Sequence, residues 1–362
     1  MEGARVDGVR VAAVRRRLEA SGIGQALVCD PQSVRYLTGV RVDPGERFFG
    51  LLLAVDGGAV LFANRLFPIG NVEGARVVAF DDADDPLALV AAEVAAGQAL
   101  GVDKVLPARF LLPLQERGAA AGFALASGAV DGARAIKDAG EQEDMRTASR
   151  INDAAMERFA ALAHEGAVER DVAAELEGIY RELGAAGHSF APIVSFGANA
   201  ADPHHEPDGT VLAAGDAVLF DVGCVAAGYC SDMTRTFFWR EAGQRQREVY
   251  DIVRRANEAA CAVVAPGMRS CDIDAAARRV IEDAGYGEYF THRLGHQIGL
   301  DVHEPGDISP ANEAPVEPGM CFSIEPGIYL PGDFGVRIED LVLVTETGCE
   351  ILNHYSHDLK VL

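Results

Sequence analysis

The sequence contains very little lysine: only Lys104, Lys137 and Lys360 occur in 362 residues, whereas aspartate and glutamate together number 55. The formal net charge is −23 at pH 7, which disfavours nucleic acid and anionic membrane surfaces as partners because both are negatively charged. No uncharged apolar run reaches the roughly 18 residues that a membrane span requires. The N-terminal segment carries charges throughout, which is untypical of a secretory signal. We therefore expect a cytoplasmic protein.

Paired cysteines and phosphate loops are missing as well. The seven cysteines are odd in number, scattered and without a C-x-x-C pair, which is typical of reduced residues in a cytoplasmic protein. The N-terminal part has no Gly-rich phosphate loop. An apolar content of 49% and a charged content of 24% are those of an ordinary globular protein, and 362 residues exceed the usual length of one domain. Two domains are therefore expected.

The periodicity of apolar residues changes along the chain. Residues 1–130 alternate helical patterns with short strand-like runs, which predicts an α/β domain with a partly parallel sheet. A linker over 131–138 leads into a second domain over 139–362. There, two amphipathic helices precede an antiparallel hairpin with acidic residues, and the same order then repeats. The repeat predicts a two-fold duplicated α+β domain with a functional site between its halves. The four helices are expected at residues 141–162, 172–183, 249–263 and 270–281.

Asp221 and Asp232 lie in the first predicted hairpin, LFDVGCVAAGYCSDMTRTFFW. The apolar run 217–222 passes through a Gly- and Ala-rich stretch into a second β-prone run. If the turn centres between Ala226 and Ala227, the two aspartates face each other directly, because facing residues in an antiparallel pair have a constant index sum. Their Cβ atoms would then be roughly 5 Å apart.

Glu325 and Glu339 flank the breaker cluster Pro331-Gly332-Asp333 symmetrically, which predicts a second hairpin with a second opposed acidic pair. A lone acidic residue on a strand is usually solvated. Here both pairs lie within apolar strands, where charged residues are depleted. Four enclosed carboxylates repel one another unless cations neutralise them. Two divalent ions, which lie about 3.5 to 4 Å apart in two-metal hydrolases, supply that charge.

His296, in THRLGHQIGLDVHE, adds a nitrogen ligand to the acidic set. The oxygen-rich set favours Mn²⁺, with Co²⁺ or Zn²⁺ as alternatives. A water bridging two such ions has its pKa lowered toward neutrality, so a metal-bridging hydroxide is expected to attack a substrate carbonyl. Glu325 is the expected proton shuttle to the leaving nitrogen. The predicted ligands are Asp221, Asp232, His296, Glu325 and Glu339.

The stretch from PHHEP through DVG, SDMTRT, HRLGHQIGLDVHE and SIEPGIY to GVRIED resembles the pita-bread metallopeptidases, specifically the prolidase and aminopeptidase P branch. The resemblance runs from about residue 139 to the C-terminus, with a weaker match before it. It implies a creatinase/prolidase-like N-terminal domain and a pita-bread catalytic domain. In that family the five predicted ligand positions hold a dinuclear centre, which agrees with the charge argument. The resemblance also implies a homodimer.

Further site residues follow from the same resemblance. His204 corresponds to a residue that contacts substrate near the scissile bond, and His303 to one that helps to hold the carbonyl or tetrahedral intermediate. His292 corresponds to a residue that lines the pocket for the proline side, whereas His205 is expected only to cap a loop. Arg337 lies two residues before a predicted ligand and so shares its face of the strand. It could meet a substrate carboxylate, but we favour a role in orienting a ligand carboxylate.

The implied reaction is hydrolysis of the peptide bond before proline in small peptides with proline at the second position. A dipeptidase acting on Xaa-Pro and an aminopeptidase P acting on longer peptides share every ligand. The short N-terminal domain and HRLGHQIGLDVHE favour the dipeptidase. Methionine aminopeptidase is disfavoured because that branch generally lacks such a leading domain. A non-catalytic binding module or a metal-free creatinase-like enzyme would have lost ligands, and all five are present. Gln297 departs from the small residue common in relatives, which leaves packing or substrate access beside His296 open.

Overall fold

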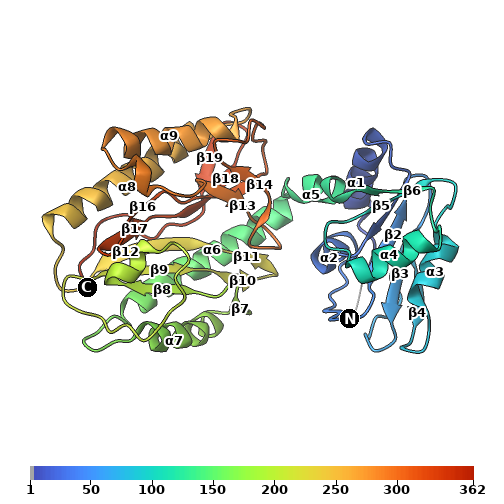
Figure 1. The fold of residues 1–362 in the computed structure, drawn as a ribbon, viewed down its shortest axis with the longest axis horizontal. Coiled ribbons are helices and arrows are strands. Elements are labelled where there is room, and N and C mark those ends of the chain that lie inside the picture. Colours follow the sequence, from blue (N-terminus) through green and yellow to red (C-terminus); the bar gives the residue numbers. More distant parts are fainter. Residues whose placement is uncertain (1–3) are drawn as a thin grey trace. The chain divides into compact units, whose positions relative to one another are not determined.

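A computed structural model describes residues 4–362, which divide into two compact units (Figure 1). The first unit ends at Arg134 and the second runs from Ala135 to Leu362, so the boundary falls within residues 131–138. The first half of that segment is the end of helix α5 (Ser127–Arg134) rather than an irregular linker. None of the helices within residues 4–362 combines the length and apolar character that crossing a bilayer requires.

The first unit is an α/β domain built on one six-stranded sheet with the order β4-β3-β2-β1-β5-β6. The pairs β3/β4, β1/β5 and β5/β6 are parallel, and the other two are antiparallel, so the prediction of a partly parallel sheet is confirmed. Its strands are β1 (Gln25–Val28), β2 (Gly50–Ala54), β3 (Ala59–Asn64), β4 (Ala75–Phe80), β5 (Ala99–Val102) and β6 (Gly122–Leu125). Its other helices are α1 (Gly8–Ala20), α2 (Pro31–Thr38), α3 (Pro86–Glu93) and α4 (Ala108–Glu116).

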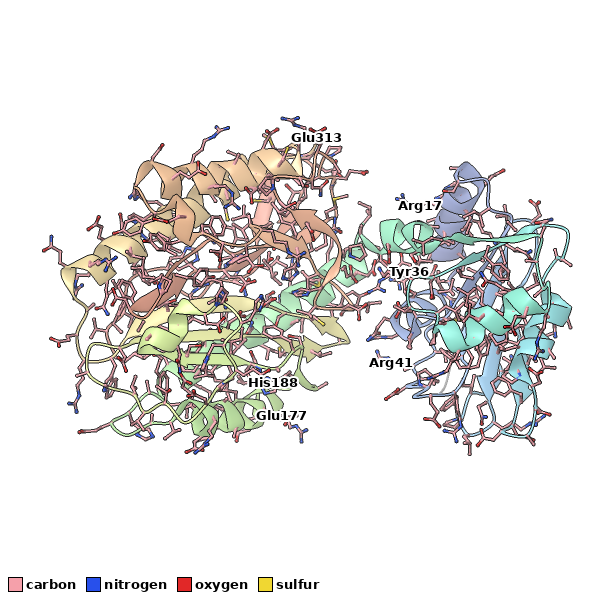
Figure 2. All side chains as sticks on the ribbon, viewed as in Figure 1. Arg17, Tyr36, Arg41, Glu177, His188 and Glu313 are labelled. Carbon is pink, nitrogen blue, oxygen red and sulfur yellow. The ribbon has the colours of Figure 1, made fainter. Side chains whose placement is uncertain are left out.

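Helix α2 is a short helix of only eight residues. Its ends are nevertheless well defined: the Asp30 carboxylate accepts the Ser33 N–H at 2.9 Å, and Gly39 ends the helix at φ 70°. The hydroxyl of Tyr36 (Figure 2) donates to the carbonyl oxygen of Ala133 at 3.1 Å and so ties α2 to α5.

The second unit contains the two predicted helix pairs. Helices α6 and α7 lie on one side of its sheets, and α8 and α9 lie on the other (Figure 1). Helix α6 begins with a capping box in which Asp138 and Glu141 satisfy each other's backbone N–H groups. It ends two residues before the predicted end, and α7 begins three residues before its predicted start. The bounds are α6 (Ala139–Ala160), α7 (Glu169–Glu182), α8 (Gln244–Val263) and α9 (Ser270–Asp283).

Antiparallel strands follow each helix pair, so the predicted duplication of the second domain is confirmed. The first set forms the sheets β12-β9-β8 and β11-β10-β7, and the second forms β14-β13-β15-β18-β19 and β16-β17. The first half contains β7 (Gly187–His188), β8 (Ile193–Phe196), the 3₁₀ turn η1 (Gly197–Ala201), β9 (Ala217–Val222), β10 (Cys224–Ala226), β11 (Tyr229–Cys230) and β12 (Met233–Phe238). The second half contains the 3₁₀ turn η2 (Gly287–Tyr289), β13 (Gly295–Gln297), β14 (Glu304–Ile308), β15 (Cys321–Ile324), β16 (Gly327–Leu330), β17 (Phe334–Arg337), β18 (Asp340–Val344) and β19 (Cys349–Ile351).

The first acid-bearing hairpin pairs in a different register from the one predicted. Strands β9 and β12 place Asp221 opposite Thr234, not opposite Asp232. The tight turn consists of Ala227 and Gly228, at φ 51° and 89°, so its centre lies one residue later than expected. Such a turn needs positive φ at both positions, and glycine meets that need far better than a second alanine. Asp232 is consequently a diagonal neighbour of Asp221 rather than directly across from it.

The second acid-bearing hairpin has the predicted register. Strands β16 and β17 pair around the breaker cluster. Beyond them, β15 and β18 continue the same register with Ile324 opposite Asp340. Because facing residues keep a constant index sum, Glu325 and Glu339 face each other in the interval between the two ladders.

Candidate metal centre

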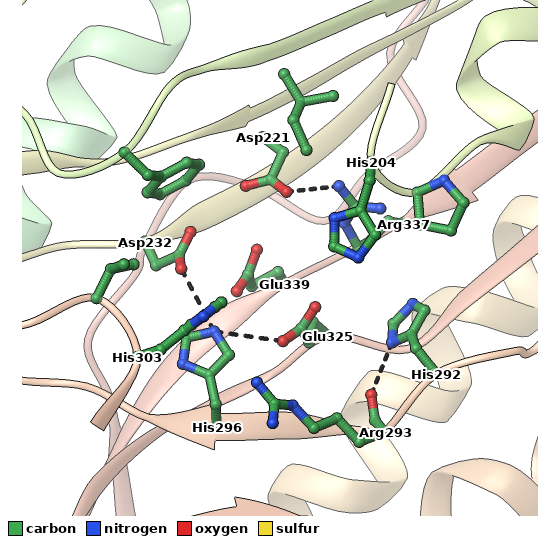
Figure 3. A pocket seen from close by; sticks show the side chains of 14 residues that line it. His204, Asp221, Asp232, His292, Arg293, His296, His303, Glu325, Arg337 and Glu339 are labelled. Atoms are coloured by element: carbon green, nitrogen blue, oxygen red, sulfur yellow. Dashed lines mark hydrogen bonds and ion pairs between the residues drawn. The ribbon is translucent and has the colours of Figure 1, made fainter. Parts of the chain in front are cut away.

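A cavity of about 520 Å³ is formed by residues from both halves of the second domain (Figure 3). All nine side chains that the sequence singled out for the site line this cavity, although they are spread over more than 130 positions of the chain. Its lining residues are Phe190, Ile193, Pro203, His204, Asp221, Asp232, His292, Arg293, His296, Val302, His303, Glu325, Arg337 and Glu339.

The five predicted ligands converge on one point of the cavity wall (Figure 3). Nε2 of His296 lies 3.5 Å from Oε1 of Glu325 and 3.7 Å from Oδ2 of Asp232. Potential ligand atoms of Asp232, His296 and Glu339 all lie within 4.8 Å of one another. Asp221 approaches this group from the adjoining strand β9. The structure therefore brings together four acidic side chains from the two acid-bearing hairpins and one imidazole from strand β13.

Burial determines the protonation of this cluster. It raises the pKa of Glu325 to about 7, and it raises the pKa values of Asp232 and Glu339 well above their ordinary range, with repulsion among the carboxylates adding to the effect. Burial, together with the nearby His303, lowers the pKa of His296 to about 3. The imidazole is therefore neutral, and its Nε2 lone pair is free to bind a metal ion.

Two oxygen atoms of the cluster are buried without a hydrogen-bond donor. Oδ1 of Asp221 and Oδ1 of Asp232 receive no hydrogen bond from any part of the chain over residues 4–362. A buried carboxylate oxygen without a partner is costly, and a cation removes that cost. Carboxylate oxygens with one imidazole nitrogen suit hard or borderline divalent ions. The residues present therefore fit a metal centre.

Arg337 is buried beside the cluster and holds two of the predicted ligands in place. Its Nη2 donates to Oδ2 of Asp221 at 2.5 Å. Its Nε and Nη1 donate to the hydroxyls of Thr234 and Tyr329 at 3.1 and 2.8 Å. The Thr234 hydroxyl donates in turn to Oε2 of Glu339 at 2.6 Å. These contacts are the ones that an orienting role for Arg337 requires, because all three guanidinium nitrogens face groups of the protein.

His303 lies next to the cluster on the loop between β13 and β14. Its ring meets that of His296 edge to face, with the centroids 4.1 Å apart. The following residue, Glu304, forms a buried ion pair with Lys137, whose Nζ is 3.0 Å from Oε2. Oε1 of Glu304 also accepts the N–H of Leu300 at 3.0 Å. These contacts fix the loop that presents His303 to the cavity.

His292 and His204 line the cavity away from the ligand cluster (Figure 3). Nδ1 of His292 lies 2.7 Å from the carbonyl oxygen of Arg293, and its Nε2 lies 2.8 Å from the hydroxyl of Tyr329. Burial lowers the pKa of His292 to about 4, so this ring is neutral. His204 follows η1, and its backbone N–H donates to Oδ1 of Asp202 at 3.0 Å. The ring of His292 and the backbone of His204 are therefore both held by contacts within the protein.

Two sequence families match the chain. Residues 143–346 match metallopeptidase family M24, and residues 10–136 match the Creatinase/Prolidase N-terminal domain. The chain belongs to metallopeptidase family M24. The resemblance noted in the sequence is thus confirmed, and the family implies that this M24 member is a peptidase dependent on divalent metal ions.

Relatives of this M24 metallopeptidase match it over almost its whole length. An uncharacterized peptidase of Staphylococcus aureus is 38% identical over 341 residues, which cover 91% of this chain and 95% of the relative. The crystal structure of a dipeptidase from Pyrococcus horikoshii has a TM-score of 0.92 at 35% identity and covers 98% of this chain and 100% of that chain. A recombinant prolidase from Thermococcus sibiricus has a TM-score of 0.91 at 36% identity and covers 98% of each chain. The predicted fold, a creatinase/prolidase-like N-terminal domain followed by a pita-bread domain, is confirmed.

Gln297 affects packing in this metallopeptidase and not the cavity. Its side chain is buried, is not part of the cavity lining and places Nε2 3.8 Å from Sδ of Met320. A Cβ atom added at Gly306 would lie 2.5 Å from the same Nε2, so the glycine makes room for the larger side chain. The departure from a small residue is therefore accommodated on the strand face opposite His296.

Several residues of the site were not recognised in the sequence. Thr234 and Tyr329 connect Arg337 to other site residues, and Arg293 adds a cation to the cavity wall. The position of Thr234 could have been found, because it lies two residues after Asp232 and so faces the same way. Tyr329 and Arg293 carry no such spacing signal. Three apolar residues also line the cavity, and no sequence pattern distinguished them from the core: Phe190, Ile193 and Val302.

Replacing Arg337 with methionine is expected to weaken metal binding because Asp221 and Thr234 lose the donor that orients them. Groups that orient metal ligands typically contribute 10- to 100-fold to affinity or activity. The measurement is the Mn²⁺ concentration that gives half-maximal peptidase activity. R337K is the matched control: it keeps the charge but not the planar, three-way geometry, so an intermediate effect is expected. A Mn²⁺ dependence of R337M equal to that of the wild type would contradict the orienting role.

Proposed function

We propose that the chain hydrolyses the peptide bond before proline in Xaa-Pro dipeptides, using two divalent metal ions held by the five predicted ligands. Mn²⁺ is the favoured ion, with Co²⁺ or Zn²⁺ as alternatives. The observation that carries the proposal is the convergence of all five ligands with His204, His292 and His303 on one cavity. We further propose that the enzyme is a cytoplasmic homodimer. Measurement of molar mass by light scattering tests the dimer.

Different residues of the cavity perform different steps of the proposed reaction. The metal ions, when bound, supply an activated water nucleophile and polarise the substrate carbonyl. Glu325 accepts a hydrogen bond from Ser323 at 3.0 Å and lies on the cavity wall, where it takes a proton and passes it to the leaving nitrogen. His204 and His303 face the same space and donate to the carbonyl oxygen as it gains negative charge. The bond before proline is a tertiary amide without an N–H, so no step depends on that hydrogen.

Arg293 supports a preference for dipeptides. It lines the cavity next to His292, the predicted proline-side residue, and its Nη1 is held 2.5 Å from Oδ1 of Asp307. In an Xaa-Pro dipeptide the terminal carboxylate follows the proline ring directly, so a cation at this place suits a dipeptide and not the interior of a longer chain. An Xaa-Pro aminopeptidase acting on longer peptides is the alternative, since it would use the same metal ligands.

A comparison of Leu-Pro with a Leu-Pro-initiated tripeptide, both with added Mn²⁺, tests the proposed specificity. Faster turnover of the dipeptide is expected. R293M is expected to lower kcat/KM for Leu-Pro roughly 10- to 100-fold, because a hydrogen bond to a charged group contributes about 1.5 to 3 kcal/mol. Leu-Pro amide is the control substrate, since it lacks the carboxylate and its turnover should not change in R293M. Exclusive turnover of the longer peptide would establish the aminopeptidase instead.

A further inference from the structure

Glu169 is a fully buried carboxylate that lies outside the cavity. It is the first residue of α7, its exposed fraction is 0%, and it does not belong to the cavity lining. A buried carboxylate normally needs a cation or several hydrogen-bond donors. Its nearest ring nitrogen is Nε2 of His205, 2.8 Å from Oε2.

The donors to Glu169 all come from one segment, residues 196–208. Oε1 accepts the N–H of Phe196 at 2.6 Å and the side-chain amide of Asn199 at 3.1 Å. Oε2 accepts the N–H of Asp208 at 3.1 Å and lies next to His205. The two oxygens thus contact both ends and the interior of this segment. The donor residues lie 27 to 39 positions after Glu169 in the sequence.

This segment presents His204 to the cavity. Pro203 and His204 line the cavity wall, whereas the next residue, His205, turns the other way to contact Glu169. On its opposite side, η1 lies directly against β17: a Cβ atom added at Gly335 would be 1.9 Å from the carbonyl oxygen of Ala200. The segment is therefore enclosed between a buried carboxylate and the strand that carries Arg337.

We infer that Glu169 and His205 are positioning residues that fix His204 for its contact with substrate, an inference that rests on the role proposed above for His204. The sequence alone indicated only a loop cap for His205. The contacts add a specific consequence, because two adjacent histidines face opposite ways and the buried one anchors the one that faces the cavity. Displacing a group that contacts substrate by about 1 Å can lower a rate on the order of 100-fold.

The variant E169Q tests this inference. Glutamine keeps the shape of Glu169 but replaces one accepting oxygen with an NH₂ group, so one pair of donors loses its acceptor. We expect kcat for Leu-Pro to fall by about 10- to 100-fold while the bound metal per chain stays at the wild-type level. H205A is also expected to lower kcat, but by a smaller factor than E169Q. If E169Q does not fold, H205A provides the test. E175Q is the matched control, since Glu175 is an exposed residue of the same helix and its substitution should leave kcat unchanged.

A double-mutant cycle with H204A separates positioning from general stability. If Glu169 acts through His204, E169Q changes kcat less than about twofold in the H204A background, because the group it positions is already missing. An equal loss of kcat in both backgrounds, or a loss of bound metal in E169Q, overturns the inference. A wild-type kcat in E169Q and H205A also overturns it and leaves the proposed function standing. A wild-type kcat in H204A would contradict the proposed role of His204 and would therefore also overturn the inference.

Discussion

Replacing Asp232 with asparagine is expected to abolish metal-dependent peptidase activity. Asp232 is almost fully buried, its Oδ2 is 3.7 Å from Nε2 of His296, and its Oδ1 has no donor within residues 4–362. Asparagine keeps the volume but removes the charge that a divalent ion requires. Residues that merely orient a metal ligand contribute 10- to 100-fold, so the loss in kcat/KM for a direct ligand should exceed about 100-fold.

The measurement for D232N combines kcat/KM for Leu-Pro with bound metal per chain, determined by mass spectrometry after dialysis against Mn²⁺. Both should fall. D283N is the control, because Asp283 is exposed at the end of α9 and does not line the cavity. Wild-type metal content together with activity within tenfold of the wild type would show that Asp232 is not a ligand.

The metal-free protein is expected to lose stability as the pH rises from 6.5 to 8. Burial holds the pKa values of Asp232 and Glu339 well above their ordinary values. The folded chain therefore keeps protons that the unfolded chain releases, and stability that is complete at low pH decreases as the pH rises. A carboxyl that stays protonated in the folded chain while it is ionised in the unfolded chain lowers stability by at most about 1.4 kcal/mol per pH unit. Below pH 6.5 the buried histidines have the opposite effect on stability, because burial lowers the pKa values of His292 and His296 to about 4 and about 3. The unfolded chain then binds protons that these folded rings do not, so stability falls as the pH falls.

Thermal unfolding of chelator-treated protein at pH 6.5, 7.25 and 8 measures this effect. Saturating Mn²⁺ should remove most of the decline, since bound cations compensate the ionised carboxylates and bind only the folded chain. E339Q should also flatten the decline in metal-free protein, because the neutral amide does not ionise. A metal-free unfolding temperature that stays constant or rises between pH 6.5 and 8 would contradict the account of a charge cluster that requires cations.

The two hairpins show how far spacing can predict a site. For Glu325 and Glu339, the breaker cluster lies at the midpoint, so the predicted register is the observed one. For Asp221 and Asp232, the midpoint would have required two alanines in the turn. The backbone instead uses Ala227 and Gly228 at positive φ, which shifts the pairing. Both aspartate side chains remain on the same side of the hairpin after this shift, so both still line the cavity.

The order of helix pairs and the duplicated acidic hairpins could be predicted from the sequence, because they depend on local periodicity and spacing. The nine cavity-lining candidates came from that spacing and, for His204, His292 and His303, from the resemblance of short motifs to the metallopeptidase family. The tertiary structure decided the three-way contact of Arg337 and the anchoring of the His204 segment by Glu169. Those features depend on which buried polar groups meet after distant segments pack together. No spacing along the chain encodes that, since a buried carboxylate takes whichever donors the folded chain brings to it.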